Sequence, residues 1–274
     1  MTLGELYAAE EANPDLTIYG GQRGYIALNF LLSSVFPDFA DLGKPELRFD
    51  SPEFIRFLEL VKTMDENAQR FTGDYSYSDG NVLLCPLTLT AINDYRKILL
   101  MDEMQYLDIT GFPSDSGTGC LITVPQQIGI VSGTGNEDAA WSFIEFMLSE
   151  AEQAKTDLLP LRVSSLEAQI AAASEDIPAH SETRYVDPYA AKAGMSMETE
   201  TVEIPEMKGL SEAEANELRG ILDSAAGIYN EQLTNPCFGI VYAECRSLLT
   251  GERDAEATAK AIQSKMELYL AERN

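Results

Sequence analysis

The chain has 274 residues, of which 45 are acidic and 19 are basic, so its formal net charge is −26. A charge this negative repels the phosphates of nucleic acids and of anionic membrane surfaces, which excludes both as expected partners and otherwise indicates a solvated surface. Hydrophobic residues make up 45% of the sequence, which is enough to bury the core of one large domain or two smaller ones and excludes global disorder.

The first part of the chain alternates helix and strand signals. Thr2 and Glu5 have the spacing of a capping box, which predicts a short helix at the start. A strand is then predicted over residues 16–19, and the apolar spacing predicts a helix over 23–34.

The next signals come after a turn-rich stretch. Ser51 and Pro52 are favourable residues for a helix start, and they precede one apolar face made of Phe54, Phe57, Leu58 and Val61. A strand is predicted over 82–85, helical spacing over 88–99, and a buried strand over 105–112.

The central part continues this order. Short strands are predicted within 122–130, and Asn136 is the N-cap of a helix with the apolar face Ala140, Phe143, Ile144, Met147 and Leu148. A strand followed by a helix indicates an α/β architecture rather than a helical bundle. Residues 174–208 are polar and rich in acids and helix breakers, which predicts an irregular segment.

The last part of the chain is predicted to be helical. Ser211 and Glu214 form a second capping box ahead of an apolar stripe at helical spacing, namely Leu218, Ile221, Leu222, Ala225 and Tyr229. Pro236 begins a further helix that runs through Leu249, and Asp254 caps the final helix.

The sequence shows no catalytic motif. Its single histidine, His180, has no G-x-S-x-G pattern to accompany it and is interpreted as a surface residue. The Gly133–Gly135 stretch precedes a helix, but Glu137 and Asp138 occupy the helix start where a phosphate binds, which indicates a tight turn. With 45 carboxylates, a glycosidase that uses two of them stays open.

Other classes of site and segment lack their signals. Four cysteines, Cys85, Cys120, Cys237 and Cys245, lie apart without a C-x-x-C pair, so neither a disulfide scaffold nor a metal site is predicted. No stretch approaches the roughly 18 apolar residues of a membrane span. No basic segment followed by an apolar one begins the chain, so no signal peptide is expected in it.

Several segments resemble the family of extracellular solute-binding proteins that serve ABC sugar importers, the group that contains maltose-binding protein. DSPEF at 50–54 and DGNVLL at 79–84 resemble the family's helix and its "G-x-x-A-M" strand. Residues 109–113 and 128–131, followed by NEDAAWSFIEF at 136–146, resemble its "G-x-P … N-x-E-A-A-W-x-F-I-x-F" segment.

The resemblance continues toward the end of the chain. SEAEQ at 149–153 and LPLR at 159–162 are similar to the family's "S-x-E-x-Q … L-P-x-R", and residues 261–270 fit its C-terminal helix. The order of these segments across nearly the whole chain carries the resemblance, since no one of them is diagnostic.

The resemblance implies an α/β fold of the periplasmic-binding-protein type (type II) with two lobes. Lobe two is expected to comprise residues 1–108 and 162–274, and 109–161 is expected to be the returning segment of a partial lobe one. The family's leader and first lobe-one segment have no counterpart in this sequence, which implies a truncated form. Trp141 and Phe143 are then expected to be under-buried, on a surface that is labile, sticky or completed by another chain.

The resemblance places ligand contacts in three regions. Gln22 and Arg23 follow the first lobe-two strand and suit hydrogen bonds to sugar hydroxyls, while Tyr25 suits stacking on the ring. The alternative for this region is a helix turn with an exposed arginine. Thr88 lies in the second region, with a helix cap as its alternative role.

The third region holds Asn235 and Phe238, where Phe238 is either an aromatic platform for a sugar or a core residue. The family's lobe-one contacts come mostly from the segment without a counterpart, so this chain alone is expected to bind weakly.

The resemblance implies non-catalytic binding of a carbohydrate, expected to be an oligosaccharide, for delivery to an ABC transporter permease, with no cofactor. The complete protein is expected to be an extracytoplasmic lipoprotein, at the cell surface or in the periplasm. Two alternatives stay open on the same fold. A carbohydrate-active enzyme is distinguished by turnover that depends on one carboxylate, and a cell-surface sugar sensor by binding without a neighbouring permease.

Overall fold

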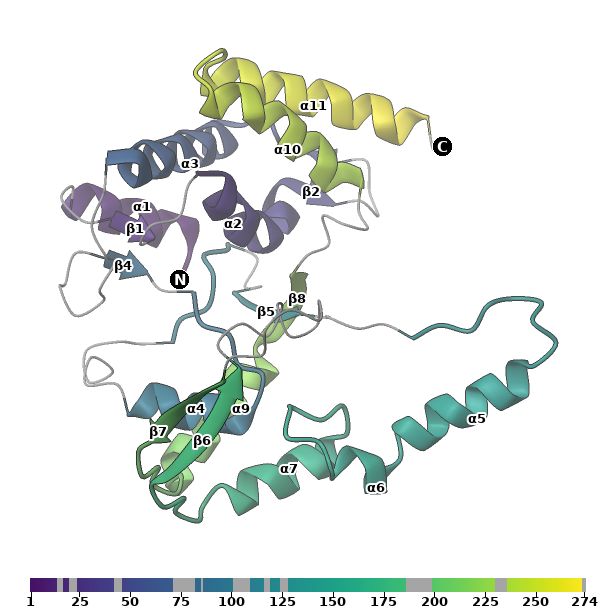
Figure 1. The fold of residues 1–274 in the computed structure, drawn as a ribbon. Coiled ribbons are helices and arrows are strands. Elements are labelled where there is room, and N and C mark those ends of the chain that lie inside the picture. The colour runs from purple at the N-terminus through teal and green to yellow at the C-terminus, as the bar shows by residue number, and fades with distance from the viewer. Residues whose placement is uncertain are drawn as a thin grey trace. The chain divides into compact units, whose positions relative to one another are not determined.

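The computed structural model describes residues 1–13, 17–19, 24–41, 46–70, 82–84, 86–100, 109–115, 119–123, 128–185, 199–229 and 236–272 (Figure 1). The chain divides into two compact units. Unit 1 comprises residues 1–87, 108–127 and 220–274, and unit 2 comprises residues 88–107 and 128–219. These boundaries differ from those of the two expected lobes, which stay a prediction. The fold is mixed α/β, mostly helical with small sheets, in agreement with the α/β class.

Unit 1 is built mainly from helices. They are α1 (Leu3–Ala12), α2 (Gly24–Phe39), α3 (Pro52–Arg70), α10 (Pro236–Leu249) and α11 (Ala255–Ala271). Its strands are β1 (Thr17–Tyr19), β2 (Ala40–Asp41), β3 (Glu46–Leu47), β4 (Val82–Leu84), β5 (Cys120–Thr123) and β8 (Ala225–Tyr229). β1 pairs in parallel with β4, and β5 pairs in parallel with β8, so both pairs join segments that are far apart in sequence. β2 and β3 pair antiparallel.

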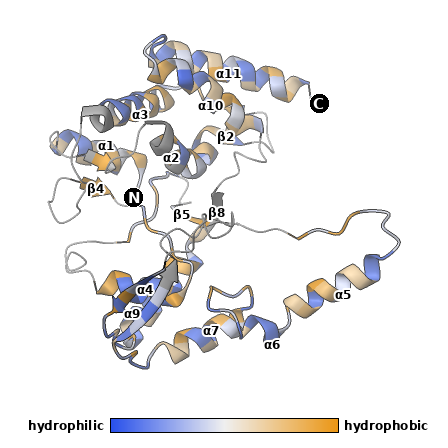
Figure 2. Ribbon diagram, viewed as in Figure 1, coloured by the Kyte–Doolittle hydropathy of each residue, from blue (hydrophilic) through white to orange (hydrophobic). Residues whose placement is uncertain are grey.

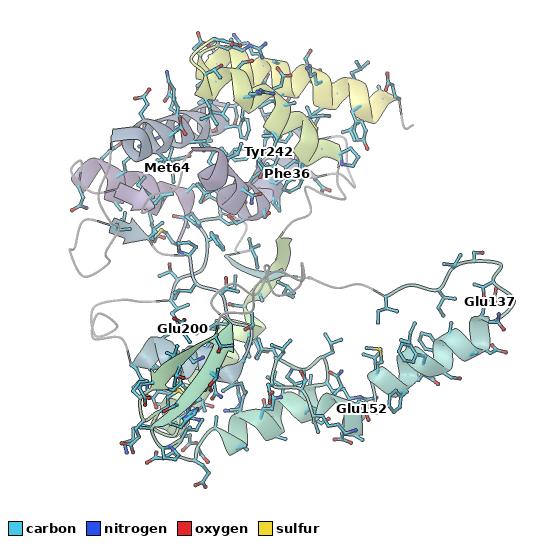
Figure 3. The ribbon with its side chains drawn as sticks, viewed as in Figure 1. Phe36, Met64, Glu137, Glu152, Glu200 and Tyr242 are labelled. Carbon is cyan, nitrogen blue, oxygen red and sulfur yellow. The ribbon has the colours of Figure 1, made fainter. Side chains whose placement is uncertain are left out.

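An aromatic and aliphatic core holds unit 1 together. The predicted apolar face of α3 is confirmed, because Phe54, Phe57, Leu58 and Val61 are all fully buried. The Phe54 ring lies 5.0 Å from that of Phe49 in an edge-on arrangement, which adds a favourable ring contact to the burial of apolar area. At the edge of this core the Tyr242 hydroxyl of α10 donates to Asn29 Oδ1 of α2 at 2.8 Å (Figure 3).

Local capping chemistry sets where three helices of unit 1 begin, whereas the predicted cap Asn136 makes no side-chain capping bond at the start of α5 (Glu137–Met147). Thr2 Oγ1 accepts from Glu5 N at 3.1 Å and the Glu5 carboxylate accepts from Thr2 N, which completes the capping box of α1. Ser51 Oγ accepts from Phe54 N at 3.2 Å at the start of α3. Asp254 Oδ1 accepts from Ala257 N at 2.7 Å at the start of α11. These bonds satisfy backbone donors that the first helical turn leaves unpaired.

Glu244 is a nearly buried carboxylate between α10 and α11, with 9% of its side chain exposed. It accepts hydrogen bonds from Lys265 Nζ and, at 2.5 Å, from Arg253 Nη1. The bond from Lys265, helped by that from Arg253, outweighs burial and lowers the pKa of Glu244 below its ordinary value of 4.5.

We expect Glu244→Gln to lower the free energy of unfolding at neutral pH and to make stability less sensitive to acid. Because the folded pKa is depressed, the carboxylate stabilises the fold fully above 4.5, and this contribution is lost as the pH falls through the folded pKa. Urea unfolding of both proteins between about pH 7 and pH 3 measures the effect. The matched control is Glu256→Gln, which breaks the exposed Glu256–Lys260 pair. A stability gap between wild type and Glu244→Gln that stays constant down to the lowest pH would contradict the expectation.

Unit 2 is a chain of short helices and one antiparallel ribbon. Its elements are α4 (Ile92–Leu99), α5 (Glu137–Met147), α6 (Glu150–Gln153), α7 (Val163–Ala172), β6 (His180–Tyr185) and β7 (Thr199–Ile204). The start of α9 (Glu212–Asp223) also belongs to it, and the end of that helix belongs to unit 1. Ser211 Oγ and the Glu214 carboxylate form the predicted capping box of α9. No helix in the described ranges is both long and apolar enough to cross a membrane.

Three strands, β6, β7 and β8, were not predicted from the sequence. Residues 174–208 hold the β6–β7 ribbon instead of only irregular chain, with His180 opposite Ile204 and Tyr185 opposite Thr199. The stripe that begins at Leu218 does not continue as one helix, since α9 ends at Asp223 and residues 225–229 form β8. A glycine at position 227 disfavours helix, and pairing with β5 supplies the hydrogen bonds of an extended chain.

Two further boundaries differ from the sequence-based ones. Residues 109–112 are not a strand, because Gly111 has φ of +71° and Phe112 N donates to Gly119 O at 2.5 Å, which closes a turn. Residues 105–108 of that prediction lie outside the described residues. The helix predicted over 88–99 begins at Ile92, and 128–130 are not a strand.

Candidate functional site

Only some of the predicted ligand-binding residues lie within the described residues. Gln22, Arg23 and Asn235 lie outside the described residues, so their roles stay predictions. Tyr25 lies in the first turn of α2, and its side chain is outside the description. Thr88 and Phe238 are described, and the structure gives them very different surroundings.

Phe238 is a core residue. Its side chain lies in the first turn of α10 and is 1% exposed, and its ring stacks on that of Phe36 at a centroid distance of 4.6 Å. A ring covered on this scale has no open face for a sugar, so core packing, the alternative left open by the sequence, describes its place in this structure.

Thr88 is exposed in the extended segment that leads into α4. It does not cap the helix. That role belongs to Asp94, whose Oδ2 accepts from Thr90 N at 2.9 Å, from Thr90 Oγ1 at 2.7 Å and from Ala91 N at 3.0 Å. The Thr88 residue is therefore exposed before a helix start whose backbone N–H groups at Thr90 and Ala91 already donate to Asp94.

The charge state of Asp94 follows from these bonds. Burial alone would raise the pKa of this carboxyl, but the bonds donated by Thr90 and Ala91, together with the charge of Lys97, lower its pKa overall. Asp94 is thus ionised and occupied as a helix cap, which makes it unsuited to act as a general acid.

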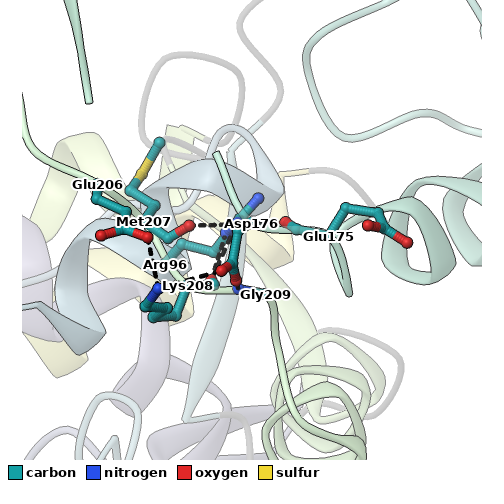
Figure 4. Close-up of polar contacts among 7 residues, drawn as sticks. All are labelled: Arg96, Glu175, Asp176, Glu206, Met207, Lys208 and Gly209. Carbon is teal, nitrogen blue, oxygen red and sulfur yellow. Dashed lines mark hydrogen bonds and ion pairs between the residues drawn. The ribbon is translucent and has the colours of Figure 1, made fainter. Parts of the chain in front are cut away.

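A buried arginine, Arg96, attaches α4 to two other segments of unit 2 (Figure 4). Arg96 is 4% exposed, and its Nε and Nη2 donate to Lys208 O at 3.1 and 2.9 Å. Nη2 also donates to Met207 O at 2.9 Å and to Glu175 O at 2.8 Å. The guanidinium thereby joins α4 to the segment after α7 and to the segment after β7.

The Asp176 carboxylate, next to this cluster, bonds to the same segment after β7. Asp176 Oδ1 accepts from Gly209 N at 2.8 Å, and its Oδ2 accepts from Lys208 Nζ at 3.1 Å. The bond from Gly209, followed by that from Lys208, lowers the pKa of Asp176. The donors and acceptors of the cluster are engaged with one another, so it positions α4 and offers little to a ligand.

A compact turn that follows α5 lies beside the Thr88 segment. Leu159 N donates to Thr90 O at 2.8 Å, which attaches the turn to the residues before α4. Gln153 crosslinks the turn, since its Oε1 accepts from Leu161 N at 2.7 Å and its Nε2 donates to Met147 O at 3.0 Å. Arg162 Nε donates to Leu148 O, and Ser149 Oγ accepts from Glu152 N at 3.4 Å.

We define the Thr88 surface as Thr88, Thr90, Leu158 and Leu161, all in unit 2. Leu158 is 58% exposed and Leu161 is 79% exposed, and both hydroxyl side chains are on the surface. Thr88 contributes an exposed hydroxyl and the two leucines contribute exposed apolar groups, and a sugar can contact groups of both kinds.

The other residues considered for catalysis or phosphate binding, His180 and the Gly133–Gly135 stretch, make local structural contacts. His180 is on the surface, as predicted, and its pKa is raised by its bond to Pro178 O and then by the Glu182 carboxylate. Gly133 and Gly135 have φ near +78° and +73°, which agrees with the predicted tight turn. Within the described residues, no group of three or more His, Cys, Asp or Glu side chains has the geometry to hold a metal ion.

Sequence reasoning missed Asp94 and Arg96. The capping position before α4 is Ala91, three residues before Asp94, so the Ser/Thr-x-x-acid signal for a helix start is absent there. No signal pointed to Arg96, because its acceptors are backbone carbonyls of residues far along the chain.

Comparison with known proteins adds no family assignment, since no family model and no curated protein matches this chain.

Proposed function

We propose that the protein binds a carbohydrate, most simply an oligosaccharide, without altering it, and presents it to the permease of an ABC importer outside the cytoplasm. The observation that carries the proposal is the family resemblance, which includes the turn at 149–162. The residues that resemble the family pattern there, Ser149, Gln153 and Arg162, each make a specific bond that shapes the turn. These bonds give the resembling residues a local structural role in the turn, and the proposal of carbohydrate binding rests on the resemblance itself.

Two coarser features support the same proposal. The mixed α/β fold, with two parallel strand pairs formed by segments distant in sequence, is compatible with the α/β class to which the proposed fold belongs. The exposure of Trp141 and Phe143, 53% and 58%, is what the resemblance led us to expect of this helix.

Ligand-dependent stabilisation tests the proposal. The protein is heated with a panel of mono- and oligosaccharides at millimolar concentration, and the melting temperature of each mixture is recorded. A ligand that binds only the folded state stabilises it by RT ln(1 + [L]/Kd), which is about 2.7 kcal/mol at one hundred times Kd. We expect at least one oligosaccharide to raise the melting temperature in a concentration-dependent way.

The variant Thr88→Val assigns binding to the Thr88 surface. It keeps the shape of the side chain and removes one hydroxyl, so we expect a several-fold loss of affinity, equivalent to about 0.5–1.5 kcal/mol. Thr201→Val, on the exposed face of β7, is the matched control and is expected to bind like wild type. Equal affinity of the two variants would remove Thr88 from the site.

A further inference from the structure

Helix α5 presents an exposed apolar surface. Trp141, Phe143 and Phe146 are 53%, 58% and 56% exposed, and Met147 is 39% exposed. No side chain of α5 is buried, although its whole length is described. Figure 2 shows the apolar residues along this helix. Solvent-exposed aromatic side chains gathered on one helix are typical of an interaction surface.

The apolar residues cover more than half of the helix circumference. At about 100° per residue, Trp141, Ile144, Met147, Phe143 and Phe146 span an arc of about 220°. Asp138, Ser142 and Glu145 occupy the remaining arc. A helix that is apolar over such a wide arc suits a groove that encloses it rather than a flat surface.

The charged side chains of α5 itself are all acidic, and two cations lie beyond its C-terminal end, where Lys155 pairs with Glu152 and Arg162 donates to Leu148 O. Residues 137–153, which contain α5 and α6, include Glu137, Asp138, Glu145, Glu150 and Glu152 and no lysine or arginine. Glu137 and Glu152 mark the two ends of this segment in Figure 3. Bonds from backbone N–H groups, its own first, lower the pKa of Glu137, so its charge is fixed at neutral pH.

The acidic side chains of α5 limit the kinds of partner that could bind this helix. A second copy of the chain would bring the same acids and a net charge of −26, and an anionic membrane would repel them equally. A partner with basic side chains around an apolar groove would gain from both the apolar contact and the charge complementarity.

We propose that α5 is the docking helix for a protein partner that offers a hydrophobic groove bordered by lysine and arginine side chains. The face that docks is Trp141, Phe143, Ile144 and Met147, with Glu145 and Asp138 toward the basic rim. The proposal rests on the exposure and charge of α5 and does not depend on carbohydrate binding.

Trp141 reports on this surface directly because it is the only tryptophan in the sequence. The full chain is titrated with a designed helical protein that carries a leucine-lined groove rimmed by lysine, and with the same design rimmed by glutamate. We expect the lysine-rimmed probe to shift the Trp141 emission to the blue with saturation, and to bind more weakly as salt is added. The glutamate-rimmed probe is expected to leave the emission unchanged.

Two variants separate docking from general stickiness. Phe143→Glu is expected to raise the Kd for the lysine-rimmed probe at least tenfold. Leu268→Glu, which changes an equally exposed residue of α11, is expected to leave it unchanged. Far-UV circular dichroism checks that both variants remain folded.

Other results would overturn the proposal. They are equal binding of the two probes, no response to the lysine-rimmed probe, and a blue shift produced by phospholipid vesicles but not by that probe. A blue shift that grows with protein concentration alone would assign the face to a second copy. Blue-shifted emission protected from iodide in the most dilute sample would show that the chain covers the face itself.

Discussion

Replacing Phe238 by alanine is expected to lower the free energy of unfolding by about 3–5 kcal/mol. The side chain is 1% exposed and stacks on Phe36, so its removal loses buried apolar area and leaves a cavity beside α2. Urea unfolding followed by circular dichroism measures the loss. Phe143→Ala is the matched control, because that ring is 58% exposed and its removal is expected to change stability by about 0.5 kcal/mol or less.

The variant Phe238→Leu separates the core role from a ligand platform. Leucine keeps most of the buried apolar volume and removes the aromatic ring, so we expect a smaller loss of stability and unchanged affinity for any sugar that stabilises the wild type. If the affinity falls sharply while the stability is retained, Phe238 contacts the ligand and its assignment to the core must be revised.

Replacing Arg96 by methionine is expected to cost about 2–4 kcal/mol of stability in unit 2. Methionine keeps the apolar stem but leaves the carbonyls of Glu175, Met207 and Lys208 without their donor. The expected loss is smaller than for three fully buried hydrogen bonds, because the bonds to Glu175 O and Lys208 O are only partly buried.

Amide hydrogen exchange measures the local stability of the segments that Arg96 joins. Local opening free energies are expected to fall for α4 and for residues 207–210 in the Arg96→Met variant. Arg219→Met is the matched control, since it removes an exposed ion pair with Glu167 that is worth about 0–1 kcal/mol. Equal exchange in the two variants would mean that Arg96 does not hold these segments together.

The helix starts could be predicted from the sequence because their causes are local. Thr2 with Glu5, Ser211 with Glu214, and Asp254 all bond to backbone groups within one turn. The under-burial of Trp141 was also foreseen, although it came from the resemblance and not from local chemistry.

The strands and the site depended on contacts that a linear pattern does not contain. Residues 225–229 continue a helical spacing, and their pairing with β5 is set by a segment about one hundred positions earlier. Phe238 has the same sequence signal whether it faces a ligand or Phe36. Arg96 and Asp94 acquired their roles from backbone groups, whose positions only the fold determines.

The most direct test of the proposed function combines binding with recovery of the ligand. The protein is titrated with the oligosaccharide that raises its melting temperature most, and binding is measured by isothermal titration calorimetry. The sugar is then recovered and its molecular mass is determined by mass spectrometry. The account predicts saturable binding and a sugar of unchanged mass after prolonged incubation. Shorter products that accumulate with time, or the absence of binding by every sugar in the panel, would contradict it.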